Sequence, residues 1–121
     1  MANTFKTVTF AAEPASSGTP YLMYTTANST TTVVLGLILT NIHTAAVTAS
    51  VQLDSNTGNR NGNNNVANGV SELIKNVSIP QGSSLEILTG SKVVLETTDA
   101  IKVDCSVADK LSGTLSIMEI T

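Results

Sequence analysis

The sequence predicts an all-β protein, a single antiparallel β-sandwich of about eight strands. Runs of β-branched and aliphatic residues recur along the 121-residue chain, separated by Pro, Gly, Asn and Ser at spacings of about 8–12 residues. The stretch from Ile79 to Thr121 alternates strand and turn without a break and ends in a strand. A jelly-roll and an immunoglobulin-like topology both fit this pattern.

Residues 1–20 are expected to form either an N-terminal arm or an edge strand, followed by a linker rich in Pro, Ser and Gly. Phe5 to Phe10 has the alternation of a strand, and Pro14 and Pro20 then interrupt regular structure. Large apolar side chains on a weakly anchored segment usually have a partner that buries them. Phe5 and Phe10 are therefore candidates for contact with a neighbouring subunit.

Residues 21–121 are expected to form the sandwich, and three strands open it. Residues 21–27 form the first. The second, residues 31–41, is apolar on both faces, which predicts a central strand covered on each side, with a bulge or a close backbone approach at Gly36. Residues 47–53 alternate with period two, which predicts one buried and one solvated face.

An Asn/Gly-rich tract, residues 54–69, is predicted to be a long loop because it has almost nothing to bury. We expect the tract to be mobile or to become ordered against a neighbouring subunit. Asn56, Arg60 and Asn63 are the candidate contact residues within it.

The same tract partly matches a calcium-binding loop through Asp54, Asn56 and Gly58. Its glycine comes one position early, and Asn65 stands where a bidentate glutamate is needed. No metal and no cofactor is therefore expected.

The rest of the chain, from residue 70 onward, supplies five expected strands. A turn at residues 80–83 follows the first of these strands. Cys105 lies on the same face of a later strand as Ile101, Val103 and Val107, so it is predicted to be a small buried hydrophobic residue. The expected strands are residues 70–79, 85–88, 92–96, 101–107 and 114–120.

Composition excludes several classes of function. Aromatic residues make up 3% of the chain, there is no Trp, and the net charge is −3, so neither base stacking nor phosphate binding is favoured. The longest apolar run, residues 33–39, is much shorter than the roughly 20 residues of a membrane helix. The first residues do not have the pattern of a secretory signal. The sequence also lacks a recognisable set of acid, base and nucleophile, so we expect no enzymatic activity. We expect no nucleic-acid partner, no membrane partner and synthesis in a reducing cytoplasm.

The segments IPQGSSLEIL, SKVVLETTDAIKV and LSIMEIT, with NSTTTVVLGLILTN before them, resemble a family of small all-β virion proteins of tailed bacteriophages, including phages of cyanobacteria. The resemblance covers residues 20–121. It implies a structural protein that is located in the virion and made in the host bacterial cytoplasm.

The expected function is capsid decoration, in which the protein acts as cement on the outer surface of the major capsid protein lattice. The resemblance implies a homo-oligomer, with a trimer favoured. Three alternatives stay open. The first is a neck, tail, baseplate or fibre component of the same virion; the others are a receptor-binding and a carbohydrate-binding β-sandwich module.

Overall fold

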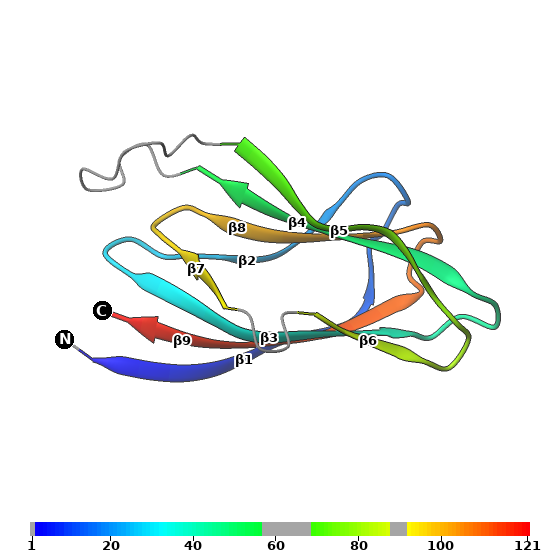
Figure 1. Ribbon diagram of the computed structural model, residues 1–121, viewed down its shortest axis with the longest axis horizontal. Coiled ribbons are helices and arrows are strands. Elements are labelled where there is room, and N and C mark those ends of the chain that lie inside the picture. Colours follow the sequence, from blue (N-terminus) through cyan, green and yellow to red (C-terminus); the bar gives the residue numbers. More distant parts are fainter. Residues whose placement is uncertain (1, 57–68, 88–91) are drawn as a thin grey trace.

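A computed structural model describes residues 2–56, 69–87 and 92–121, and within them the chain is all-β. Two antiparallel sheets lie face to face around a shared apolar core (Figure 1). This confirms the predicted class. The described residues form nine strands: β1 (Asn3–Glu13), β2 (Tyr21–Thr25), β3 (Thr31–Asn41), β4 (Val47–Ser55), β5 (Gly69–Ile79), β6 (Ser84–Ile87), β7 (Val93–Leu95), β8 (Ala100–Cys105) and β9 (Leu111–Ile120).

The strands pair as a set of nested hairpins. One sheet, here called sheet A, has the order β1-β9-β3-β6, and β7 pairs with β3 beside β6. The other, sheet B, has the order β2-β8-β4-β5. Strands from the start of the chain therefore pair with strands from its end, and both termini lie at the same end of the molecule (Figure 1).

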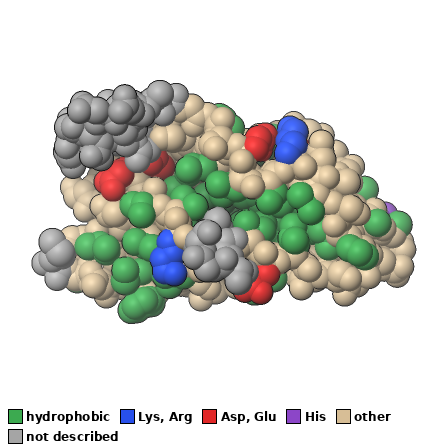
Figure 2. Space-filling model, viewed as in Figure 1, with side chains coloured by type: hydrophobic (Ala, Val, Ile, Leu, Met, Phe, Trp, Pro, Cys, Tyr) green, Lys and Arg blue, Asp and Glu red, His purple; other side chains and the backbone are tan. Residues whose placement is uncertain are grey.

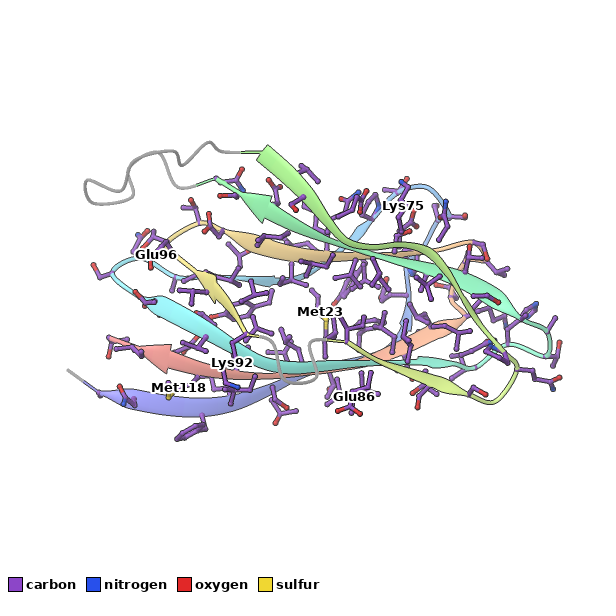
Figure 3. All side chains as sticks on the ribbon, viewed as in Figure 1. Met23, Lys75, Glu86, Lys92, Glu96 and Met118 are labelled. Carbon is purple, nitrogen blue, oxygen red and sulfur yellow. The ribbon has the colours of Figure 1, made fainter. Side chains whose placement is uncertain are left out.

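The core consists of the inward-facing residues of both sheets, as the period of two in a strand requires. Leu37 and Leu115 from sheet A and Val51 and Val103 from sheet B are fully buried. Figure 3 shows Met23 between the two sheets. Cys105 is 2% exposed in the same cluster, which confirms the prediction that it is a buried hydrophobic residue.

Two local predictions about the backbone are also confirmed. The β3–β9 register shifts between Val34 and Gly36, where a bulge or close approach was expected. The turn after β5 closes with a hydrogen bond from the Ser83 N–H to the Pro80 carbonyl (3.1 Å), and Gly82 takes the left-handed φ of 69° that this turn needs.

Three expectations need correction. β3 is covered on one face only, because sheet A has no third layer among the described residues, and Ile38 on its outer face is 42% exposed. β4 continues to Ser55 and β5 begins at Gly69, so both ends of the expected loop at residues 54–69 belong to strands. β9 begins at Leu111, three residues before the expected strand at residues 114–120, because Leu111 pairs with Asn41 and Glu13.

Candidate interaction surface

The two phenylalanines of the N-terminal segment have opposite environments. Residues 3–13 form the edge strand β1, paired along its length with β9, so the alternative of a separate arm does not describe them. Phe10 is 8% exposed and packs edge-on against Tyr21, with ring centroids 5.2 Å apart. Phe5 is 71% exposed. Because the two residues are an odd number of positions apart, a strand must place them on opposite faces.

Only one of the candidates in the Asn/Gly tract lies within the described residues. Asn56 is fixed at the end of β4: its backbone N–H donates to Asp99 Oδ1 (2.8 Å), and its Nδ2 donates to the Thr98 carbonyl (3.2 Å). Arg60 and Asn63 lie outside the described residues. Asn56 is therefore part of a hydrogen-bonded junction between β4 and the turn before β8.

Asp54, which suggested calcium, and Asp99, which holds Asn56, each have other contacts. Asp54 Oδ2 forms an ion pair with Lys102 Nζ at 3.0 Å. Asp99 is fully buried, and its Oδ2 accepts a hydrogen bond from the Glu96 backbone N–H (3.0 Å). Within residues 2–56, 69–87 and 92–121, no three His, Cys, Asp or Glu side chains are grouped as a metal site would need.

The outer face of sheet A carries a continuous apolar row across four strands. In the register, Phe5 of β1 lies opposite Met118 of β9, Met118 opposite Val33 of β3, and Val33 opposite Val94 of β7. Phe5 is 71% and Val94 51% exposed, and the two middle residues are half-buried. We call these four residues the apolar row. Figure 3 places Met118 on the side of sheet A away from Met23.

Hydrophobic side chains also gather elsewhere on the surface. Figure 2 shows them between two sheet edges that face the viewer. One edge is formed by β5 of sheet B, and the other by β6 and β7 of sheet A. Leu73 of β5 and Leu85 and Val93 of β6 and β7 are half-buried members of the core rim. Two exposed charged residues, Glu86 and Lys92, lie on the β6–β7 edge (Figure 3).

A network of polar side chains lies between the two sheets, on the side of sheet A opposite to the apolar row. Glu119 Oε2 accepts a hydrogen bond from the Tyr24 hydroxyl (2.6 Å), and its Oε1 lies 2.7 Å from Lys6 Nζ. The Tyr24 hydroxyl is also 2.8 Å from Thr32 Oγ1, to which Thr26 Oγ1 donates at 3.3 Å. Tyr24 comes from sheet B and Glu119 from sheet A, so the network ties the sheets together near the chain termini.

The electrostatics of this network follow from its contacts. The Lys6 ammonium and the Tyr24 hydroxyl, in that order, stabilise the Glu119 carboxylate and hold the pKa of Glu119 below its ordinary value of 4.5. Burial, and then the hydrogen bond to Glu119, raise the pKa of Tyr24 above 10.0. The phenol therefore keeps its proton and donates a hydrogen bond to the ionised carboxylate, an arrangement that holds the two sheets together.

Sequence reasoning found Phe5 and missed the other members of the apolar row. Met118, Val33 and Val94 each alternate with buried neighbours, which is a visible local signal. Their alignment depends on registers between segments far apart in the chain.

Comparisons with protein-family models, with curated proteins and with solved structures found no match. Within the described part of the chain, no helix has the length and apolar character needed to span a membrane.

Proposed function

We propose that this chain is a non-enzymatic structural protein of a phage particle and that it decorates the outer surface of the major capsid protein lattice. The observation that carries the proposal is the apolar row. An aligned set of exposed and half-buried apolar residues on an outward sheet face is typical of a protein that binds another protein. The virion assignment itself rests on the resemblance of residues 20–121 to small virion proteins.

The strand order also supports the proposal, because it favours a type of sandwich that is common in viral capsids. We infer a jelly roll rather than an immunoglobulin-like sandwich, because β1 pairs with β9, β2 with β8, β3 with β6 and β7, and β4 with β5. Such nesting results when one long antiparallel ribbon is rolled over itself. Jelly rolls are common in viral capsid domains and also in lectins.

Energetics also favour a decoration role. Burying a side chain such as Phe5 or Val94 stabilises a complex by roughly 1.5–3 kcal/mol before association entropy is subtracted. A single contact of this size is weak, but many copies on one lattice add their contacts, and linked copies bind more tightly than separate ones. Glu86 and Lys92 would form part of a polar rim around the contact.

The test is the number and position of copies in purified phage particles. Antibody raised against the recombinant protein would label the particles for electron microscopy, and gel densitometry would give the copy number relative to the major capsid protein. Labelling over the head with hundreds of copies supports decoration. Labelling of the neck or tail with up to about a dozen copies would indicate the alternative role in the same virion. Absence from every particle would contradict both.

Receptor or carbohydrate binding would give a different result. A module of that kind would bind host cells or glycans as a free protein, and an array of bacterial surface glycans would measure it directly. We expect no binding on such an array.

A further inference from the structure

The outer edge of β1 presents a free row of peptide groups. Ala2 and Thr121 exchange both of their backbone hydrogen bonds (3.1 and 2.9 Å), and the β1–β9 register then runs without a shift to Phe10. Hydrogen-bonded and non-hydrogen-bonded pairs alternate in an antiparallel ladder. The N–H and C=O groups of Asn3, Phe5, Thr7 and Thr9 therefore point away from β9. No described strand pairs with this side of β1.

The other sheet edges in the described part of the chain are built to resist pairing. β2 is five residues long and has a bulge, and the edge beside β3 is divided between β6 and β7, of four and three residues. β5 is long, but its register with β4 shifts twice. Short, divided and bulged edges are the usual protection against edge-to-edge association. β1 has none of these features between Asn3 and Phe10, and Lys6 is the one charged residue of that stretch.

We propose that two copies of this chain pair through β1 in antiparallel orientation, with Phe5 opposite the partner subunit's Phe5. A two-fold axis at Phe5 makes this a hydrogen-bonded pair, because the Phe5 peptide groups face the edge. Asn3 then lies opposite the partner subunit's Thr7, and Thr4 opposite the partner subunit's Lys6.

Charge and apolar contact select this register over its neighbours. A shift that centres the axis on Lys6 places two lysines directly opposite each other, which is repulsive. A shift that centres it on Thr7 places Phe5 opposite threonine and leaves its ring exposed. With the axis at Phe5, the two rings meet, and the apolar rows of the two copies join into one row across both subunits.

The expected dimer is weak. The pairing involves about seven residues of each copy, a length of about 24 Å, so it buries less than the roughly 1,600 Å² of a standard interface. This inference does not depend on the proposed function, since it concerns the free protein.

Site-directed cross-linking tests the register. A hydrogen-bonded pair has Cα atoms about 5.5 Å apart, which suits a disulfide, whereas two Thr7 residues would be about 14 Å apart. Under mild oxidation, the Phe5→Cys variant of the full chain should form a covalent dimer on a non-reducing gel. The Thr7→Cys variant and the wild type, whose Cys105 is buried, should not. Cross-linking of Thr7→Cys without Phe5→Cys would overturn the proposal, as would no cross-linking of either.

Sedimentation of protein that has not been cross-linked tests whether dimerisation depends on the peptide groups at the β1 edge. Proline at position 7 removes an N–H that faces the edge and leaves the β1–β9 ladder intact. Thr7→Pro should weaken the dimer at least tenfold, and Thr9→Pro, beyond the paired stretch, should leave it unchanged. Melting temperatures of both variants establish that they are folded. A wild type that is monomeric up to about 1 mM or trimeric, or a dimer that Thr7→Pro does not weaken, would overturn the proposal.

Discussion

The ring of Phe10 occupies the space that a side chain at Gly113 would fill. The two residues lie opposite each other in the β1–β9 register, and a Cβ added to Gly113 would lie 2.6 Å from Phe10 Cζ. The glycine therefore leaves room for an aromatic ring from the edge strand, and that ring reaches Tyr21 of sheet B. This contact makes the N-terminal segment part of the core.

The Phe10–Gly113 contact predicts a large effect from one methyl group. Gly113→Ala should destabilise the protein by about 1–3 kcal/mol, because the Phe10 ring must leave its position. Gly36→Ala is the matched control, since no atom lies within 4 Å of its added Cβ, and it should change stability by less than about 1 kcal/mol. Urea unfolding curves measure both. Equal effects of the two variants would show that the ring moves freely.

Both carboxylate oxygens of the buried Asp99 should be needed for stability, because each accepts a hydrogen bond from a backbone N–H. Asp99→Asn replaces one oxygen by an NH₂ group that faces a backbone N–H of Asn56 or Glu96, and should cost about 2–3 kcal/mol. Asp109→Asn makes the same chemical change at an exposed residue with φ of 58°, which asparagine tolerates, and should be neutral. Thermal unfolding compares the two. Equal melting temperatures would refute the double-acceptor role.

The depressed pKa of Glu119 predicts a loss of stability in acid. The folded state favours the carboxylate, so its contribution is present above pH 4.5 and is lost as the pH falls through the lower folded-state pKa. At neutral pH, Glu119→Gln should cost about 1 kcal/mol, because Lys6 is half exposed and the ion pair contributes little. The difference between the wild type and the variant should shrink below pH 4.5. A difference independent of pH would mean that the charge of Glu119 is not involved.

Cys105 should behave as a packing residue. Cys105→Ala should cost roughly 1 kcal/mol and Cys105→Asp far more, because the side chain is 2% exposed among apolar neighbours.

Reductant and chelator should leave the melting temperature of the wild type unchanged. A fall of several degrees in chelator would revive the calcium hypothesis.

Local features were predictable from the sequence because they depend on neighbouring residues. The turn at residues 80–83, the irregularity at Gly36 and the buried face of Cys105 each follow from a few adjacent side chains. The placement of β1 does not, because it depends on pairing residues near the start of the chain with residues near its end. Local pattern alone therefore predicts that Phe10 is a contact residue, whereas its core position depends on the distant Gly113.

The apolar row also depends on pairing between segments that are far apart in the chain. Val33 lies in a run that is apolar on both faces, which predicted burial on both sides, and only the sheet order shows that one face is open. Period two assigns residues to faces, and long-range register decides which residues of one face become neighbours.

We propose that the apolar row attaches this protein to a phage capsid. The most direct measurement is cosedimentation with purified particles that lack the protein, comparing a Met118→Ser, Val94→Ser double variant with a Leu22→Ser, Val70→Ser control. All four residues are at least partly exposed, and none lies on β1, so the proposed dimer contact is not altered. We predict that the wild type and the control saturate the particles equally, and that the row variant binds at least tenfold more weakly with an unchanged melting temperature. Equal binding of both variants, or no binding of the wild type, would contradict the claim.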